Sequence, residues 1–186
     1  MSLLPFSQWL AATPGSIALH ESLYMYPLVE STHVITLCLF VGMSLVWDLR
    51  LLGVMLPNVP MTTMNRKVWP FMLVGFIIMS ITGVLLFYAI PVRTYQSIFF
   101  RIKVILLVLA GLNVWMFHSN VWRRVAEWDQ DAVPPRSARW AGALSLLFWI
   151  CIIFAGRMIA YNWFDCDRQP QSAFVNWAAG CVVESE

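Results

Sequence analysis

Residues 28–56, LVESTHVITLCLFVGMSLVWDLRLLGVML, decide the fold of this chain. The segment is longer than the ~20 mostly apolar residues with which a helix crosses a bilayer. It nevertheless contains four polar side chains that are costly at such a depth, Glu30, His33, Ser44 and Asp48. At ~100° per residue, these four fall within an arc of roughly 60° on one helix. We therefore predict a membrane-spanning helix with one polar stripe, which must face protein, water or a cofactor rather than lipid.

The composition indicates an integral membrane protein. Of the 186 residues, 60% are hydrophobic and only 12% are charged, whereas globular proteins have about 45–50% apolar and about 25% charged residues. The lipid bilayer is the expected environment, and other membrane subunits or further copies of the chain are the expected protein partners. A formal net charge of +2 gives no reason to expect a nucleic acid partner.

The hydrophobic pattern predicts an all-α fold, an integral membrane four-helix bundle. Prolines and charged segments divide the apolar stretches into four predicted spans, at about 28–56, 69–90, 100–121 and 139–161. Residues 1–27 precede these spans, and the break at Thr13-Pro14-Gly15 predicts short N-terminal interfacial helices there. Residues 162–186 are too polar and too short to span again, so they form a predicted extracytoplasmic tail.

The distribution of basic residues predicts the orientation of the chain in the membrane. Seven of the 12 Lys and Arg residues lie on the side of the two predicted interspan loops, and five lie on the side of the termini. Because basic residues favour the cytoplasmic side, we expect both termini in the periplasm of a bacterial inner membrane. Cys166 and Cys181 then lie in an oxidising compartment, and we predict a disulfide between them.

Antiparallel spans place five polar residues at a similar depth. At ~1.5 Å per residue, Glu30, His33, Lys103, Arg157 and Tyr161 are predicted within about two turns of the surface on the side of the termini. One explanation is structural, because Glu30 and Arg157 can neutralise each other inside the bundle. The other is a b-type haem, because imidazole ligates iron and cationic side chains pair with propionates. In that interpretation His33 is the axial ligand, Lys103 and Arg157 bind propionates or a quinone carbonyl, and Glu30 balances charge or relays a proton.

The second iron ligand is left open by the sequence. His118 is predicted roughly 20 Å from His33 along the membrane normal, so the two histidines cannot ligate one iron. Three possibilities remain for the sixth coordination position of the iron. It is filled by Met158, it is filled by a neighbouring subunit, or it is open. The roles of His118 and Asp48 are left undetermined.

Four short motifs, one in each span, carry a resemblance to known families. They are His33 followed by Gly42, Thr82-Gly83, Lys103 followed by Asn113, and Gly156-Arg157. This arrangement resembles the membrane domain of copper-resistance protein D and the membrane-bound protoporphyrinogen oxidase of bacteria. The stretches DLRLLG at 48–53, FRIK at 100–103 and AGRMIAY at 155–161 are similar to an uncharacterised bacterial family of four-helix membrane proteins. The resemblance, which covers about 28–161, implies a haem- or porphyrin-linked role centred on His33 and Lys103.

The sequence thus predicts a b-haem or quinone-linked electron-transfer subunit with its site near the periplasmic surface. Two other classes are left open. One is a non-catalytic subunit that anchors or scaffolds a larger membrane complex, and the other is a permease for copper or another small solute. Whether the protein is an enzyme is also left open.

Overall fold

The computed structural model describes residues 3–161, 164, 166 and 169–181, and every regular element within these residues is a helix. The longest helices are α3 (Met25–Leu51), α4 (Met61–Ala89), α6 (Ile98–Met116) and α8 (Arg136–Ile159). The shorter ones are α1 (Leu4–Ala11), α2 (Pro14–Glu21), α5 (Pro91–Tyr95), α7 (Val125–Trp128) and α9 (Ala173–Ala179). A π-helical turn, Phe117–Val121, and a 3-10 turn, Trp122–Arg124, join α6 to α7. The predicted all-α class is confirmed for the described residues.

Four helical segments are long and apolar enough to cross a membrane: α3, α4, α8 and the continuous stretch Ile98–Trp128 that begins with α6. Large apolar side chains on all four are widely exposed, as Ile35 (69%), Val84 (67%), Trp115 (68%) and Ile150 (66%) illustrate. Such continuous apolar surface is unfavourable in water and suits contact with lipid. The chain is therefore a multi-pass membrane protein.

The structure corrects the predicted end of the first span. Helix α3 ends at Leu51 rather than at residue 56, and it begins at Met25 rather than at 28. The early end has a backbone cause, since Gly53 and Leu56 have φ angles of 76° and 51°. This left-handed conformation cannot continue a right-handed helix.

The second span begins earlier than predicted, at Met61 rather than at residue 69. Its first turn is bound by Asp129, which lies in the second loop. The two carboxylate oxygens of Asp129 accept hydrogen bonds from the backbone N–H of Thr62 (2.7 Å) and from its hydroxyl (2.8 Å). Because Asp129 satisfies amides that a helix leaves unpaired at its start, the helix extends into a polar stretch. The third and fourth spans begin at 98 and 136 instead of the predicted 100 and 139.

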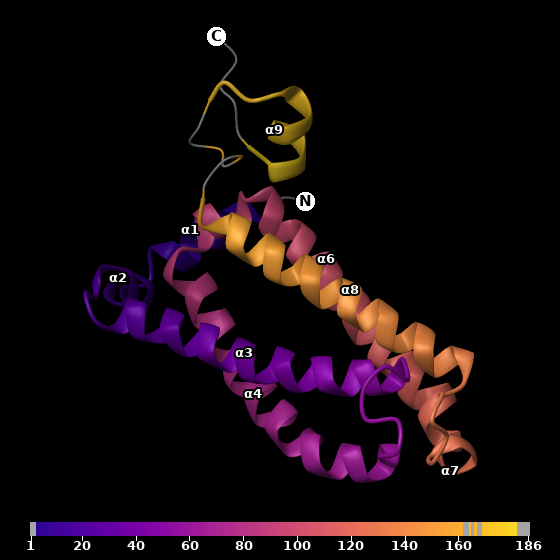
Figure 1. Cartoon of the computed structure of the whole chain (residues 1–186). Coiled ribbons are helices and arrows are strands. Elements are labelled where there is room, and N and C mark those ends of the chain that lie inside the picture. Colours follow the sequence, from indigo (N-terminus) through magenta and orange to yellow (C-terminus); the bar gives the residue numbers. More distant parts are fainter. Residues whose placement is uncertain (1–2, 162–163, 165, 167–168, 182–186) are drawn as a thin grey trace.

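The four long helices form two closely packed pairs, α3 with α4 and α6 with α8 (Figure 1). The pairs meet where α3 crosses α8. There the rings of Phe40 and Trp149 lie 4.7 Å apart, and a Cβ built on Gly142 would lie 3.1 Å from the carbonyl oxygen of Asp48. Beyond this crossing α3 and α8 diverge toward α1, α2 and α9 (Figure 1). We call the end of the bundle with α1, α2, α5 and α9 the termini side, and the end with residues 52–60 and 129–135 the loop side.

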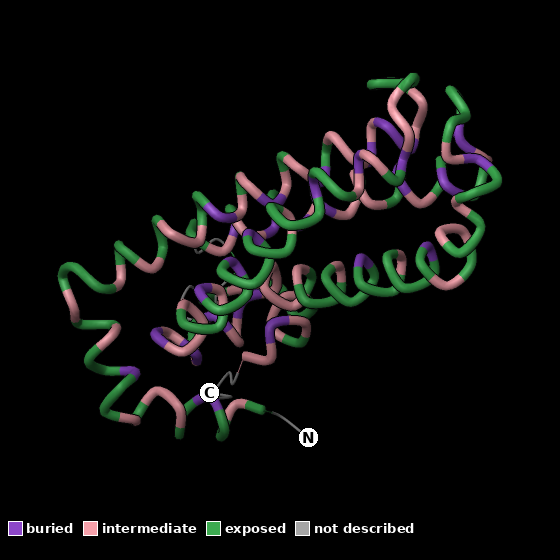
Figure 2. The backbone as a smooth tube through the Cα atoms, turned by 90° about the horizontal axis from the view of Figure 1, so that it is seen from below, coloured by how far each residue is buried: buried purple, intermediate pink, exposed green. Residues whose placement is uncertain are grey.

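Two clusters of buried side chains hold the bundle together. Figure 2 marks the buried positions along the backbone. The first contains Phe40, Met79, Ala110, Trp149 and Ile152. The second lies on the loop side and contains Leu51, Met61, Phe117, Trp128 and Ala138. No buried member of either cluster precedes Phe40 on α3. The shared core therefore lies at the crossing and on the loop side, and the helix pairs separate toward the termini side.

Arg50 joins the two loops of the loop side from a fully buried position (0% exposed). Its Nε atom donates a hydrogen bond to the carbonyl oxygen of Val59 (2.9 Å), and its Nη2 atom donates to that of Asp131 (2.9 Å). One guanidinium group therefore fixes two chain segments that are far apart in the sequence.

Helices α1 and α2 are fixed to the end of α4 by short hydrogen bonds. The hydroxyls of Thr13 and Tyr88 lie 2.8 Å apart, and the Ser16 hydroxyl donates to the carbonyl oxygen of Tyr88 (2.7 Å). Thr13 also caps α2, which begins at Pro14. The two short helices are separated at Ala12 and Thr13, next to the predicted break, and the chain breaks a second time at residues 22–24, before α3.

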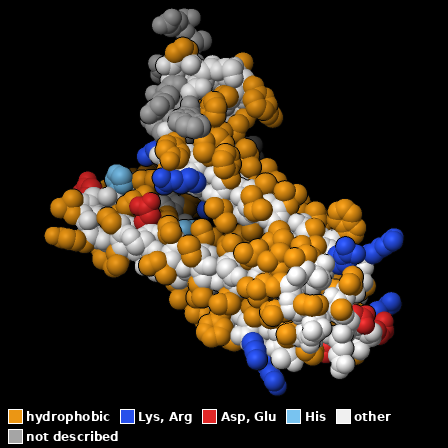
Figure 3. Space-filling view, viewed as in Figure 1, with side chains coloured by type: hydrophobic (Ala, Val, Ile, Leu, Met, Phe, Trp, Pro, Cys, Tyr) orange, Lys and Arg blue, Asp and Glu red, His pale blue; other side chains and the backbone are white. Residues whose placement is uncertain are grey.

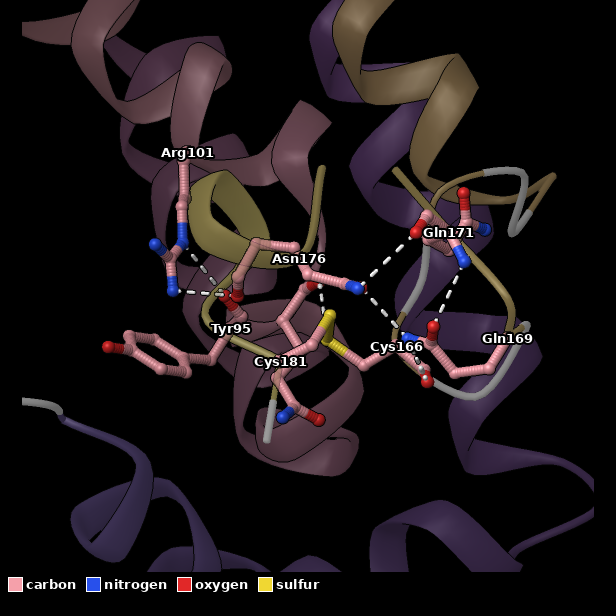
Figure 4. Close-up of a disulfide and its surroundings, with 9 residues drawn as sticks. Tyr95, Arg101, Cys166, Gln169, Gln171, Asn176 and Cys181 are labelled. Carbon is pink, nitrogen blue, oxygen red and sulfur yellow. Dashed lines mark hydrogen bonds between the residues drawn. A yellow bond between two sulfur atoms is a disulfide. The ribbon is translucent and has the colours of Figure 1, made fainter. Parts of the chain in front are cut away.

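In the tail, Cys166 and Cys181 form a disulfide with their Cα atoms 5.2 Å apart (Figure 4). The loop that they close contains α9, and it is bound to the start of α6. The Nη2 atom of Arg101 donates a hydrogen bond to the carbonyl oxygen of Ala179 (2.8 Å), and its Nε atom donates to that of Tyr95 (3.3 Å). The closed loop is thus part of the termini side rather than a separate unit.

Candidate functional site

His33 lies in the half of α3 that diverges from α8, and its imidazole ring points at α4. The Nδ1 atom lies 3.0 Å from the carbonyl oxygen of Met79 and 3.0 Å from the hydroxyl oxygen of Thr82. The Thr82 hydroxyl donates its own proton to the carbonyl of Ile78 or Met79, at 2.7 and 3.1 Å. Both neighbours of Nδ1 therefore act as acceptors, so the proton of the neutral ring belongs on Nδ1. The Nε2 atom is left with an available lone pair.

Gly83 allows the imidazole to lie close to α4. A Cβ built on Gly83 would lie 3.2 Å from Cε1 of His33, which is tighter than ordinary van der Waals contact. Any larger residue at this position would push the ring away from Met79 and Thr82. The Thr82-Gly83 motif of the sequence thus has a physical role, because Thr82 faces Nδ1 and Gly83 provides the space.

Lys103 reaches the same region from the other helix pair. Its Nζ atom lies 3.5 Å from a Cβ built on Gly156, so the side chain runs along the surface of α8 at a glycine. The ammonium group is close enough to His33 to interact with it electrostatically. Among the residues that the structure describes, no hydrogen bond or ion pair binds this ammonium group. A half-buried cation without a carboxylate is costly in a membrane protein, and it is well suited to an anionic ligand.

The structure does not bring Glu30 to Arg157, in contrast to the predicted pairing. The guanidinium group of Arg157 donates instead to the hydroxyl of Tyr161 (3.2 Å), one turn along the same helix, and lies over its ring. Glu30 is exposed and lies near Tyr26. The divergence of α3 from α8 on the termini side separates the two charges. The five predicted site residues thus fall into three groups. His33 lies near Lys103, Arg157 contacts Tyr161, and Glu30 lies apart from both pairs.

A hollow marks the region where the two helix pairs separate. In Figure 3 it lies between α3 and the α6–α8 pair, and basic, acidic and histidine side chains gather around it within a mostly apolar surface. His33 lies on α3 and Lys103 on α6, so these two side chains come from different helix pairs. The candidate site therefore lies between the two helix pairs.

The rest of the predicted stripe, Ser44 and Asp48, lies deep in the α3–α8 contact and is almost fully buried. The Ser44 hydroxyl lies 3.4 Å from a carboxylate oxygen of Asp48. The stripe is therefore divided: its loop-side half joins helices, and only His33 and Glu30 lie in the diverging half.

His118 makes a similar but more local contact than His33. Its Nδ1 atom lies 3.1 Å from the carbonyl oxygen of Val114 on the same helix, and the ring lies beside Trp69 and Trp122 on the exposed surface. Within the described residues no group of three or more His, Cys, Asp or Glu side chains is placed to hold a metal ion. A metal at His33 would therefore have to bring other ligands with it, as the iron of a haem does.

Sequence reasoning missed the contribution of the α4 backbone to this site. The Met79 carbonyl oxygen meets His33 only because α3 packs on α4. A carbonyl oxygen carries no signal in the sequence, although the neighbouring Thr82-Gly83 motif marks the correct turn of α4.

Four apolar helices that could each cross a bilayer, with polar residues gathered between two helix pairs, define a multi-pass membrane protein of four helices. Residues 18–162 match a family of unknown function, DUF6644, and the chain belongs to this family. No curated protein and no solved structure matches the chain. The resemblance to copper-resistance protein D and to the membrane-bound protoporphyrinogen oxidase stays an expectation.

Proposed function

We propose that this protein is a b-haem-binding subunit of membrane electron transfer, with His33 as the axial ligand of the iron. The proposed haem lies in the polar hollow on the termini side, between the α3–α4 pair and the α6–α8 pair. When bound, it supplies a centre that accepts and releases one electron at a time.

The observation that carries this proposal is the contact between His33 Nδ1 and the carbonyl oxygen of Met79, at 3.0 Å. Histidines that ligate metals almost always donate their second ring N–H to a carbonyl, a carboxylate or water, which fixes the tautomer and the ring orientation. His33 has this arrangement before any metal is present, with Nε2 as the atom available for iron.

Two cations of the α6–α8 pair, Lys103 near His33 and Arg157 on α8, suit the propionates of a haem. Lys103 has no anionic partner among the described side chains and interacts with His33 across the hollow. Arg157 is exposed on the same side of the membrane, where Tyr161 orients its guanidinium group. In the proposed complex Lys103 and Arg157 hold propionates through charge-assisted hydrogen bonds, and Met158, which is buried on α8, stays a candidate second axial ligand.

We further propose that the protein lies in a bacterial inner membrane with both termini in the periplasm. The excess of basic residues on the loop side supports this orientation. The Cys166–Cys181 disulfide supports it independently, because disulfides persist in the periplasm and are rare in the cytoplasm. The proposed haem then lies near the periplasmic surface.

Absorption spectroscopy of the purified protein tests the proposal. The chain, produced in a haem-replete cell and purified in detergent, is expected to show a Soret band that shifts when dithionite is added. His33→Ala should abolish the band, whereas His118→Ala, which removes the other histidine with a carbonyl-bound Nδ1, should leave it unchanged. A wild-type protein without the band, also after titration with haemin, would overturn the proposal.

The anchoring or scaffolding subunit and the copper or small-solute permease stay alternatives. The same preparation separates them from the haem protein. Partner subunits that co-purify with a colourless wild-type chain would favour the first alternative, and copper uptake by proteoliposomes would favour the second.

A further inference from the structure

A second cavity, of about 440 Å³, lies on the termini side between α2 and the junction of α4 with α5. It is distinct from the proposed haem site, because neither His33 nor Lys103 lines it. Its volume falls within the ~300–1,000 Å³ range of small-molecule sites. The hydrogen bond from Ser16 to the Tyr88 carbonyl holds α2 against α4 at its edge. The cavity is therefore a fixed feature of the way in which the N-terminal helices cover the bundle.

The walls of this cavity combine apolar surface with both hydrogen-bond donors and an acceptor. Ile17, Ile90 and Pro91 provide apolar walls. The polar lining residues are His20, Glu21 and Arg93. The guanidinium group and the imidazole can donate hydrogen bonds, and the carboxylate can only accept them.

A row of ionisable side chains leads from the cavity to His33. The ring of Tyr26 lies edge-on to that of His20, with centroids 6.4 Å apart, and Tyr26 interacts electrostatically with Glu30 and Arg93. Tyr26, Glu30 and His33 follow one another on α3 at spacings of four and three residues, which places them on one helix face. Figure 3 shows acidic and histidine side chains gathered over α2 and the start of α3, beside the hollow.

We propose that this cavity binds the head group of a membrane quinone and that its quinol form donates electrons to the site at His33. The second half of this inference rests on the proposed haem. A quinone is flat, apolar and uncharged, and its two carbonyl oxygens accept the hydrogen bonds that Arg93 and His20 can donate. A quinol also donates hydrogen bonds, and Glu21 is the matching acceptor. The apolar walls hold the ring, while the isoprenoid tail extends into the lipid next to the exposed Ile17.

The charge of the walls favours a quinone over a phospholipid. A phosphate head group would gain from Arg93 but would lie against the carboxylate of Glu21, which repels it. A neutral quinone head has no such cost.

One quinol loses two protons and two electrons and becomes a quinone. Glu21 and His20 receive the protons and pass them to the water on the termini side. With a haem held by His33 in each of two protein molecules, each ferric iron would accept one of the two electrons and become ferrous.

Photolabelling tests the binding site without any need for haem. The purified chain in phospholipid nanodiscs is irradiated with an azidoquinone, and the labelled peptides are identified by mass spectrometry. Labels are expected on residues 16–21 and 88–93. Excess decylubiquinone should suppress these labels, whereas the abundant phospholipid of the nanodiscs should not. Ile17→Trp fills the cavity and should reduce labelling at least tenfold, whereas Ile35→Trp, on a lipid-exposed face of α3, should leave it unchanged. Labels spread over all exposed apolar helices, or full labelling of Ile17→Trp, would overturn the site.

Haem reduction tests the electron transfer separately. Decylubiquinol should reduce the wild-type haem, and Arg93→Gln and Glu21→Gln should each raise the quinol concentration for half-maximal reduction about tenfold. Their Soret bands and their reduction by dithionite should equal those of the wild type and of the loop-side control Arg66→Gln. Unchanged quinol dependence in both variants would overturn the inference. A wild-type chain that is photolabelled at the cavity but contains no haem would instead refute the proposed function and leave the quinone site in place.

Discussion

The imidazole of His33 on α3 and the carbonyl oxygen of Met79 on α4 lie 3.0 Å apart at the Nδ1 atom. This contact lies on the termini side of the helix crossing, where the two helix pairs have begun to separate. It therefore belongs to the α3–α4 pair alone and does not depend on α6 or α8. The histidine is oriented by α4 of its own pair, and Lys103 of the second pair is close enough to act on it electrostatically.

Gly83 should be sensitive to substitution because it faces the His33 ring. Gly83→Val is expected to displace the imidazole, to lower the haem content at least tenfold and to cost about 1–3 kcal/mol of stability, as is typical of overpacking. Gly111→Val is the matched control, since nothing lies within 4 Å of a Cβ built there. Haem content is measured by the pyridine haemochrome, and stability by thermal unfolding in detergent. Equal haem in both variants would contradict the assigned role of Gly83.

Thr82→Val removes the hydroxyl group that lies beside His33 Nδ1 while it keeps the shape of the side chain. We expect haem to be retained about 10–100-fold less tightly, as for other residues that orient a metal-binding histidine. Thr32→Val is the control, because the Thr32 hydroxyl also bonds a carbonyl one turn earlier, that of Leu28 at 2.8 Å, but does not contact His33. The measurement is the rate of haem transfer to apomyoglobin. A similar rate for both variants would show that Thr82 has only a structural role.

Arg50 is expected to be the most important single residue for the loop side. Arg50→Met removes two charge-assisted hydrogen bonds and leaves the carbonyl groups of Val59 and Asp131 without their donors. Each such bond contributes about 1.5–3 kcal/mol, so we expect a loss of about 3 kcal/mol in unfolding free energy. Arg66→Met, at an exposed position, should change it little. Thermal unfolding monitored by circular dichroism checks the difference, and comparable midpoints for the two variants would refute it.

The Cys166–Cys181 disulfide should protect the tail from proteolysis. Cys166→Ser is expected to remove about 3 kcal/mol of loop stabilisation and to release α9 from Arg101, so that a limited protease treatment cuts between residues 169 and 181. Cys38→Ser, on the exposed surface of α3, should leave the tail resistant. Alkylation of the non-reduced wild type followed by mass spectrometry gives a direct check, since two free thiols and not four are expected. Four free thiols would contradict the disulfide.

Orientation in the membrane can be tested at the loop side. Asn58→Cys lies on an exposed position between α3 and α4, and it should react with a membrane-impermeant maleimide in inverted vesicles but not in intact spheroplasts. A reporter enzyme that works only in the periplasm should be active when it is fused after Glu186. A reporter that works only in the cytoplasm should be inactive at the same position. The opposite pattern in either assay would reverse the proposed orientation and place the His33 site near the cytoplasmic surface.

The sequence by itself determined the all-α class, the number of membrane-spanning segments and the single polar face of residues 28–56. These follow from local properties, namely apolar length and the angular spacing of side chains on a helix, which do not depend on neighbouring helices. The order of the polar residues along each helix is similarly local, because each helix has a fixed rise per residue.

Only the tertiary structure decided which polar residues meet. Equal depth suggested that Glu30 would pair with Arg157, but the divergence of α3 from α8 separates them, and Arg157 turns to Tyr161. The start of α4 depends on Asp129, and the tautomer of His33 on a carbonyl of α4, both remote in sequence. Depth is one coordinate, set by the helical rise. The azimuth and separation of the helices are set by packing at sites such as Gly142 and Phe40, and short motifs in the individual helices do not specify them.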